Sequence, residues 1–557
     1  MPLVSQTFDQ LLDFTRTTSG TFVGSNGLIQ TTPASVNLLT WTQQFDNAAW
    51  ANQVAGTGVA ATVTANAGTA PDDTSTADRL QFSLAGGLSA ADITRRRQDY
   101  TTPATTHTFS VYLRSTDGTS TYNMHIISPA GATTNIVVTG SWQRFTVTGT
   151  GLGGVISYAV GLRGGQTPAN SNTADVLAWG AQLEAASAAT TYTRNNGGRF
   201  PPRFDYDPVT LAPKGLLIEE QRTNLVLYSA QFDNAAWAKN SLTVTANATV
   251  APDGTTTADK IIKAAVTTQA SILQGATTVV GAQTISFFAK AAEYDTVSFT
   301  LYNATDAHVA RGQVNLSTGA VIATQNGVIT TQSFGNGWWR ITATGTTTVS
   351  AGNTLYIYPK DVTTYLGNGV DGIFVWGAQL EAGAFATSYI PTVASQVTRT
   401  ADQCSIVAPN FAPWYNQSEG TFVSEFSFFA SADTVNSKAY FAVSDGTTNN
   451  RIFGNLATTS VPFIFIAVGG AAQANLNTGT AVTNNSVAKV ATAYKTNDFA
   501  AVLNAGTVAT DTSGTVPTVD RLGIGNLNNF SQLNGHVRSI RYYPTRLTNA
   551  QLQALTA

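Results

Sequence analysis

The chain has 557 residues, of which 11% are charged, with a net charge of −3 and a single cysteine, Cys404. This balance gives no electrostatic reason to bind nucleic acid or an anionic membrane, and one cysteine excludes an intrachain disulfide framework and a cysteine-based zinc site. The length predicts roughly three or four domains, and few Lys and Glu beside many Thr, Val and aromatic residues favour strands over long helices.

The N-terminal residues 1–36 begin MPLVSQTFDQLLDF, which lacks the basic stretch and long apolar run of a signal peptide. No apolar run approaches the roughly 20 residues that cross a bilayer. We therefore expect no membrane insertion and a protein made in a cytosol, which speaks against a secreted adhesin.

A long internal repeat follows. QFDNAAWA occurs at 44–51 and 231–238, and WGAQLEA closes each copy at 179–185 and 376–382. Apolar and polar residues alternate between these strings, for example in TVSFTLYN at 296–303, and this period of two indicates half-buried strands.

The repeat predicts an all-β fold with two β-sandwich or jelly-roll domains, at 37–193 and 224–394. Aromatic residues that recur at matched positions are expected to form the structural core, namely Phe45, Trp50 and Trp179 and their counterparts Phe232, Trp237 and Trp376.

Two further regions do not repeat. Residues 194–223 are Pro-rich but carry apolar residues, which indicates an ordered connector. Residues 395–557 contain several strand-like runs and end in a predicted short helix, because Thr548 and Gln551 have the spacing of a capping box.

Three segments resemble modules of tailed-bacteriophage head-spike and tail-fibre-like proteins: RFPPRFDYDPVTLAPKGLLIEEQRTNLVLYSAQFDNAAWAK at 199–239, WGAQLEAGAFATSYIPT at 376–392 and NGHVRSIRYYPTRLTNAQLQAL at 534–555. The resemblance implies carbohydrate-binding-like jelly rolls and a C-terminal laminin-G or concanavalin-like sandwich. In the usual pattern of these proteins, segments like 13–36 and 199–223 are contiguous. Here the first jelly roll separates them, so we expect it to be an insertion and the two segments to pack side by side.

Aromatic residues that differ between the copies are the candidates for glycan contact, because flat rings cover the apolar C–H faces of sugars. Trp41 stands where the second copy has Tyr228, and Trp339 stands where the first has Gln143. Trp414 and Tyr415 form a third aromatic candidate outside the repeat.

Catalytic and metal signatures are missing from the sequence. The four histidines have no ligand spacing, and the Glu219-Glu220 pair beside Arg222 is interpreted as an ion-pair site. Asp-rich turns at 71–73 and 252–254 suit turns better than calcium, so no cofactor is predicted, although calcium is left open. The run Arg95-Arg96-Arg97 is expected at a solvated strand edge.

These observations predict a non-enzymatic virion protein that binds host-surface polysaccharide, has other virion proteins as partners and forms a homo-oligomer. A capsid or tail decoration protein without a ligand is the alternative, and a glycan depolymerase is a third hypothesis.

Overall fold

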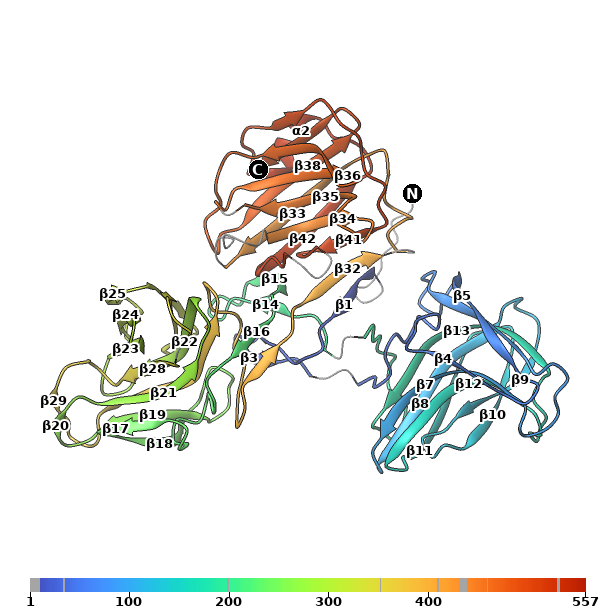
Figure 1. Cartoon of the computed structure of the whole chain (residues 1–557), viewed down its shortest axis with the longest axis horizontal. Helices are drawn as coiled ribbons and strands as arrows, with labels where there is room; N and C mark the ends of the chain where they lie inside the picture. The colour runs from blue at the N-terminus through green and yellow to red at the C-terminus, as the bar shows by residue number, and fades with distance from the viewer. Residues whose placement is uncertain are drawn as a thin grey trace. The chain divides into compact units, whose positions relative to one another are not determined.

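The computed structural model describes residues 11–33, 36–197, 200–350, 352–407, 410–429, 438–457, 459–527 and 531–557, and almost all of its regular elements are strands (Figure 1). The chain forms two compact units, one of Met1–Thr17, Pro33–Pro201 and Cys404–Tyr415, the other of Thr18–Thr32, Pro202–Gln403 and Asn416–Ala557. The predicted all-β fold with tandem sandwiches and a C-terminal sandwich is confirmed.

The first unit holds a sandwich of two five-stranded sheets with the orders β10-β9-β12-β7-β4 and β11-β8-β13-β6-β5. Its strands are β4 (Ala51–Ala55), β5 (Val59–Gly68), β6 (Ala77–Ser83), β7 (Ile93–Thr102), β8 (Thr106–Ser115), β9 (Tyr122–Ile127), β10 (Thr133–Val138), β11 (Gln143–Thr150), β12 (Gly154–Arg163) and β13 (Thr173–Glu184). The same unit contains the neighbouring strands β1 (Asp13–Thr15) and β32 (Gln403–Val407), and Cys404 is buried.

The second sandwich repeats this strand order. Its two six-stranded sheets run β17-β21-β28-β23-β24-β25 and β18-β19-β30-β22-β27-β26, so strands β25 and β26 are added between the equivalents of β10 and β11. The strands are β17 (Ala238–Asn240), β18 (Leu242–Thr249), β19 (Ala258–Lys263), β21 (Ser271–Thr277), β22 (Gly281–Ala291), β23 (Thr296–Asn303), β24 (Ala307–Asn315), β25 (Val321–Asn326), β26 (Val328–Ser333), β27 (Trp338–Thr347), β28 (Gly352–Tyr358) and β30 (Gly372–Ala382), with a small pair β20 (Thr267–Thr268) and β29 (Tyr365–Leu366).

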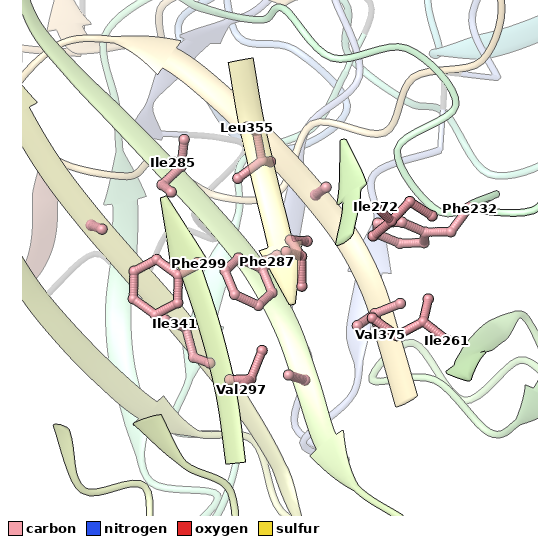
Figure 2. Close-up of a cluster of buried hydrophobic side chains, with 14 of the residues drawn as sticks. Phe232, Ile261, Ile272, Ile285, Phe287, Val297, Phe299, Ile341, Leu355 and Val375 are labelled. Atoms are coloured by element: carbon pink, nitrogen blue, oxygen red, sulfur yellow. The ribbon is translucent and has the colours of Figure 1, made fainter. Parts of the chain in front are cut away.

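Apolar and polar residues alternate along the strands, and the apolar side chains form the cores. Val297, Phe299 and Leu301 of β23 are fully buried, and Phe299 meets Phe287 of the facing sheet with ring centroids 5.5 Å apart (Figure 2). Because successive side chains of a strand point to opposite faces, the residues between them face outward. The pattern that predicted the strands therefore also determines which residues reach the surface.

The repeated strings turn out to be packing and hydrogen-bonding elements. The ring pairs Phe45–Trp50 and Phe232–Trp237 each have centroids 4.6 Å apart, and all six aromatic residues assigned to the core are buried, at 0 to 5% exposure. The carboxylate of Asp78 accepts a hydrogen bond from Phe45 N at 2.6 Å, and that of Asp259 accepts one from Phe232 N at 2.7 Å. Each string is thus tied to the neighbouring strand, β6 or β19.

Two matched asparagines clamp the start of each sandwich. The side-chain nitrogen of Asn224 donates to Ala378 O (3.1 Å) and Ile390 O (2.8 Å), and its oxygen accepts from Val226 N and Leu380 N (3.2 Å each). Asn37 makes the equivalent four bonds in the first sandwich, to Ala181 O, Thr193 O, Leu39 N and Leu183 N.

Replacing Asn224 with alanine should therefore lower the free energy of unfolding by at least about 2 kcal/mol, because it strips hydrogen bonds from four backbone groups in a buried place. Urea unfolding followed by tryptophan fluorescence would measure the loss. Asn37→Ala should cost a similar amount. A loss below about 0.5 kcal/mol in both variants would contradict the clamp.

The second unit also contains the pairs of strands that flank the insertion. Strands β2 (Thr21–Val23) and β3 (Ile29–Thr31) form one hairpin, β14 (Phe204–Tyr206) and β15 (Pro213–Ile218) another, and β16 (Arg222–Asn224) pairs with β31 (Val397–Arg399). Val23 N donates to Asp205 at 2.7 Å, and Arg203 donates to Thr21 O at 2.9 Å. Segments separated by the first sandwich in sequence therefore contact each other; residues 1–10, 34–35 and 198–199 of this region lie outside the described residues.

The C-terminal sandwich completes the second unit. One sheet runs β14-β15-β42-β33-β38-β39-β40, and its partner contains β41-β34-β35-β36-β37. The elements are β33 (Glu419–Phe428), β34 (Lys438–Ser444), β35 (Arg451–Leu456), β36 (Pro462–Val468), β37 (Ala471–Asn477), β38 (Ala488–Lys495), β39 (Phe499–Leu503), β40 (Ala509–Asp511), β41 (Arg521–Ile524), β42 (Gly535–Tyr543) and the helix α2 (Asn549–Thr556). The predicted helix is confirmed with Thr548 as its N-cap and Gln551 closing the capping box. Leu216 of β15 pairs with Val537 of β42, so the connector extends this sheet.

A buried ionic cluster joins the connector to the end of the second sandwich. Glu219 pairs with Arg203 (2.7 Å) and Arg399 (2.8 Å), Arg203 also pairs with Asp402, and the side chains of all four residues are 0% exposed. Ser388 donates to both carboxylate oxygens of Glu219. The ion-pair interpretation of Glu219 agrees with this geometry, and Glu220 pairs with Arg222.

Candidate functional site

The outer face of one sheet in the second sandwich gathers aromatic and polar side chains. On β28, Leu355 and Ile357 are fully buried in the core, so Thr354, Tyr356 and Tyr358 lie on the opposite face. On the neighbouring β23, Tyr302 stands opposite Thr354 and shares that face. We call Tyr302, Tyr356 and Tyr358 the tyrosine face.

The three rings of the tyrosine face differ in how exposed they are. Tyr356 and Tyr358 lie nearly parallel, with an interplanar angle of 11° and centroids 6.1 Å apart, as expected for residues two apart on one strand. Tyr302 meets Tyr356 edge to face at 6.4 Å and is 37% exposed, whereas Tyr358 is 7% exposed. Burial raises the pKa of Tyr358 to about 12, in keeping with the small exposure of its ring. Tyr302 and Tyr356 are therefore the rings a ligand reaches first.

Hydrogen-bonding groups flank these rings on β24. Arg311 pairs with Thr300 across the sheet and Gln313 pairs with Ser298, which places both on the tyrosine side. Arg311 lies 2.8 Å from His308 Nε2, and His308 meets the Tyr302 ring edge to face at 5.7 Å. Burial, followed by the nearby Arg311 charge, lowers the pKa of His308, so a neutral imidazole accepts the Arg311 hydrogen bond.

This arrangement suits a neutral or weakly polar ring-shaped ligand such as a sugar. Flat aromatic faces cover apolar C–H patches, and guanidinium and amide groups beside them bind hydroxyl oxygens. Thr300 Oγ1 lies 3.1 Å from His308 Nδ1, but Thr300 is only 2% exposed, so this hydroxyl is held within the sheet and is not presented to a ligand.

The residues predicted for glycan contact lie elsewhere. Trp41 is partly buried against the first core, and its carbonyl accepts the Trp50 indole N–H at 3.0 Å. Trp339 is partly buried against the second core, lies over Gly319 and donates to Leu316 O at 2.9 Å. Both indoles therefore have a packing role in their own sandwich.

Trp414 and Tyr415 form a separate aromatic group in the first unit. Phe411 stacks on Tyr415 with centroids 4.5 Å apart and meets Trp414 edge to face at 4.9 Å. Trp414 donates to Asn410 O at 2.7 Å, and Tyr415 is 8% exposed. Glycan contact by Trp41, Trp339, Trp414 or Tyr415 stays a prediction.

Sequence reasoning missed the tyrosine face, although its signal was present. In TLYIYP at 354–359 the tyrosines occupy alternate positions out of phase with the buried Leu355 and Ile357. An aromatic residue in the outward phase of a predicted strand is a stronger surface signal than an aromatic that differs between two copies.

A cleft of about 1030 Å³ in the second unit is the main alternative site, and three carboxylates are among the described residues that line it. Asp205 accepts from Val23 N and lies 2.8 Å from His536 Nε2, and Glu219 is held in the ionic cluster. Asp207 caps the turn at Val209 and Thr210. Each of these three carboxylates is therefore engaged by neighbouring groups of the second unit.

The part of the chain that the structure describes offers neither a metal-ligand cluster nor a membrane-spanning helix. No group of three or more His, Cys, Asp or Glu side chains in the described residues is placed to hold a metal ion. Asp72 and Asp253 instead accept bonds from Thr74 and Thr255 two residues on, which is turn geometry. Across the described ranges, every helix is too short or too polar to cross a membrane.

No protein-family model matches the chain, and no curated protein matches it. Among solved structures, the CBM40 domain of Ruminococcus gnavus IT-sialidase bound to α2,3-sialyllactose is similar to 27% of this chain over 89% of its own length, with 15% identity and a TM-score of 0.24. The CBM22-1–CBM22-2 tandem of Paenibacillus barcinonensis Xyn10C covers 63% of this chain and 100% of its own, with 14% identity and a TM-score of 0.20. Domains LG4-5 of the mouse laminin α1 chain cover 59% and 90%, with 8% identity and a TM-score of 0.18. Because these TM-scores are far below 0.5, the fold assignment rests on the strand orders given above.

Proposed function

We propose that this chain is a non-enzymatic glycan-binding protein of a tailed-bacteriophage virion, and that it contacts the host surface through the tyrosine face. The observation that carries the proposal is the group of outward rings Tyr302 and Tyr356 beside Arg311 and Gln313 on one sheet face. Rings and planar donors on a rigid sheet are preorganised, which reduces the entropy lost on binding.

The virion assignment is supported by the resemblance of residues 199–239, 376–392 and 534–555 to head-spike and tail-fibre-like modules. In this proposal the protein assembles in the host cytoplasm, joins other tail or capsid proteins and forms a homo-oligomer. Multiple copies would raise the avidity of a weak single site.

Binding should depend on the rings of the tyrosine face. The double variant Tyr302→Ala/Tyr356→Ala should lose about 5- to 150-fold in affinity for host polysaccharide, since two stacking surfaces of roughly 0.5–1.5 kcal/mol each are removed. A glycan array identifies the ligand, and isothermal titration calorimetry measures the affinity of the full chain.

The matched control is Tyr302→Phe/Tyr356→Phe, which keeps both rings and should retain most of the affinity. Equal binding by the alanine variant would overturn the role of the tyrosine face. Failure of the wild-type chain to bind any host glycan would favour the decoration role, and release of reducing ends from host polysaccharide would favour a depolymerase.

A further inference from the structure

The first sandwich presents a different chemistry on the corresponding sheet. Val160 and Leu162 of β12 are buried in the core, so Gly161 and Arg163 face outward. Gly161 stands opposite Arg95 of β7 on one side and His125 of β9 on the other. The corresponding strand of the second sandwich, β28, fills its outward positions with Thr354, Tyr356 and Tyr358.

The arginine run was expected at a solvated strand edge, and that prediction is wrong. Strand β7 lies between β12 and β4, and Arg95 and Arg96 are only 7% and 8% exposed. Arg96 donates to Phe45 O at 2.7 Å, so it belongs to the packing of the repeated string. Strand β4 begins at Ala51, the last residue of that string, and covers the edge that β7 would otherwise present.

The Arg95 side chain can cross β12 and reach His125 of β9 because Gly161, which lies between them, has no side chain. A Cβ atom at Gly161 would come within 2.7 Å of Arg95 Cα and 2.8 Å of Arg95 Cγ. Across this gap Arg95 Nε donates to His125 Nε2 at 2.7 Å. His125 Nδ1 therefore carries the proton and donates to Asn170 Oδ1 at 2.9 Å.

The charge of Arg95 is not compensated within the described residues. Within the described residues, its side-chain hydrogen bond goes to His125, which is neutral because burial and the neighbouring Arg95 charge lower its pKa to about 3. Arg95 Nη2 is buried without a hydrogen-bond partner, and no described carboxylate forms an ion pair with Arg95. An unpaired buried charge is costly unless an opposite charge reaches it.

Two more arginines lie on the same face. Arg163 stands two residues beyond Gly161 and donates to Ala90 O at 2.8 Å through Nε. Arg97 stands two residues from Arg95 and is paired with Asp99 at 2.7 Å. Three guanidinium groups and one engaged carboxylate leave this surface with a net positive charge.

We propose that the face formed by Arg95 and Arg163 binds an oxyanion, with the carboxylate of an acidic sugar as the ligand. A guanidinium fork matches a carboxylate in two parallel hydrogen bonds, which gives both strength and orientation. The first sandwich thus takes an anionic residue of a glycan, whereas the second takes a neutral ring, and the two sites are independent of each other.

The test titrates the full chain with sodium glucuronate, glucose, sodium sulfate and sodium phosphate at constant ionic strength, followed by calorimetry. The wild-type chain should bind glucuronate saturably at this site and should not bind glucose there. Arg95→Met and Arg163→Gln should each lower the glucuronate affinity at least tenfold. The melting temperature of Arg95→Met without ligand should not fall, because the substitution removes an uncompensated buried charge.

Arg79→Gln is the matched control, since it removes one cation from the other sheet of the first sandwich, where Arg79 pairs with Asp175, and should leave glucuronate binding unchanged. If sulfate or phosphate binds with the same dependence on Arg95, the oxyanion site is supported and the acidic sugar is rejected as its specific ligand. No saturable binding of any of the three anions at tens of millimolar, or undiminished binding by Arg95→Met, would overturn the proposal. Because the Tyr302/Tyr356 variant lies in the other sandwich, failure of either site leaves the other open to its own test.

Discussion

Replacing Glu219 with glutamine should lower the free energy of unfolding by about 3–5 kcal/mol, the cost of removing one partner from a buried ion pair. Glu219 accepts from both Arg203 and Arg399 with all three side chains 0% exposed. The variant leaves two buried guanidinium groups, of which Arg203 keeps its ion pair with Asp402 and Arg399 keeps its hydrogen bonds to Ser388 Oγ and Glu220 O. Urea unfolding of the full chain at neutral pH measures the change.

The same carboxylate should make the wild-type protein sensitive to acid. Burial alone would raise the pKa of Glu219, but the charges of Arg399 and Arg203 and the Ser388 hydrogen bonds outweigh it and lower the pKa from 4.5 to about 2. A carboxylate with a depressed folded-state pKa contributes stability above its unfolded pKa and loses it as pH falls through the folded pKa. The contribution should therefore disappear between about pH 4.5 and pH 2.

Glu220→Gln is the control for both measurements, because Glu220 pairs with Arg222 with its side chain 30% exposed. Exposed pairs contribute about 0–1 kcal/mol. If Glu219→Gln were no more destabilising than Glu220→Gln, the cluster would not stabilise the second unit. The stability difference between wild type and Glu219→Gln should also shrink as the pH is lowered through this window.

Replacing Trp237 with alanine should cost about 3–5 kcal/mol, the usual loss for a large buried aromatic residue. Its ring is 1% exposed, lies 4.6 Å from Phe232 and donates to Tyr228 O at 3.0 Å. The deletion removes the packing that closes one end of the second core.

Trp50→Ala offers a matched comparison in the other unit, since Trp50 makes the same contacts with Phe45 and Trp41 O. Limited proteolysis with mass spectrometry should show that Trp237→Ala exposes sites within residues 224–394 and leaves residues 37–193 protected. Trp50→Ala should give the reverse. Loss of protection in both sandwiches from either variant would contradict their independence as folding units.

The sequence alone determined the architecture of the repeated part. QFDNAAWA and WGAQLEA mark equivalent ends of two sandwiches because each copy needs the same contacts: the aromatic rings of the first string pack on each other, and the asparagine before it bonds to the backbone of the second string. Alternation gave the strand faces, since the period of two is a local property of an extended chain. The final helix was also predictable, because its capping box uses residues three apart.

Only the tertiary structure decided which neighbours each outward residue meets. Arg95 is buried because β4 and β12 flank it and Gly161 leaves it room, and the pairing of Leu216 with Val537 joins segments more than half the chain apart. The ionic cluster likewise unites Arg203, Glu219 and Arg399 from separate strands and loops. Strand register and sheet order are set by long-range contacts, which a single sequence does not encode locally. For that reason the tyrosine face and the basic face of the first sandwich could be identified only from the fold, whereas the sandwiches themselves could be predicted from the sequence.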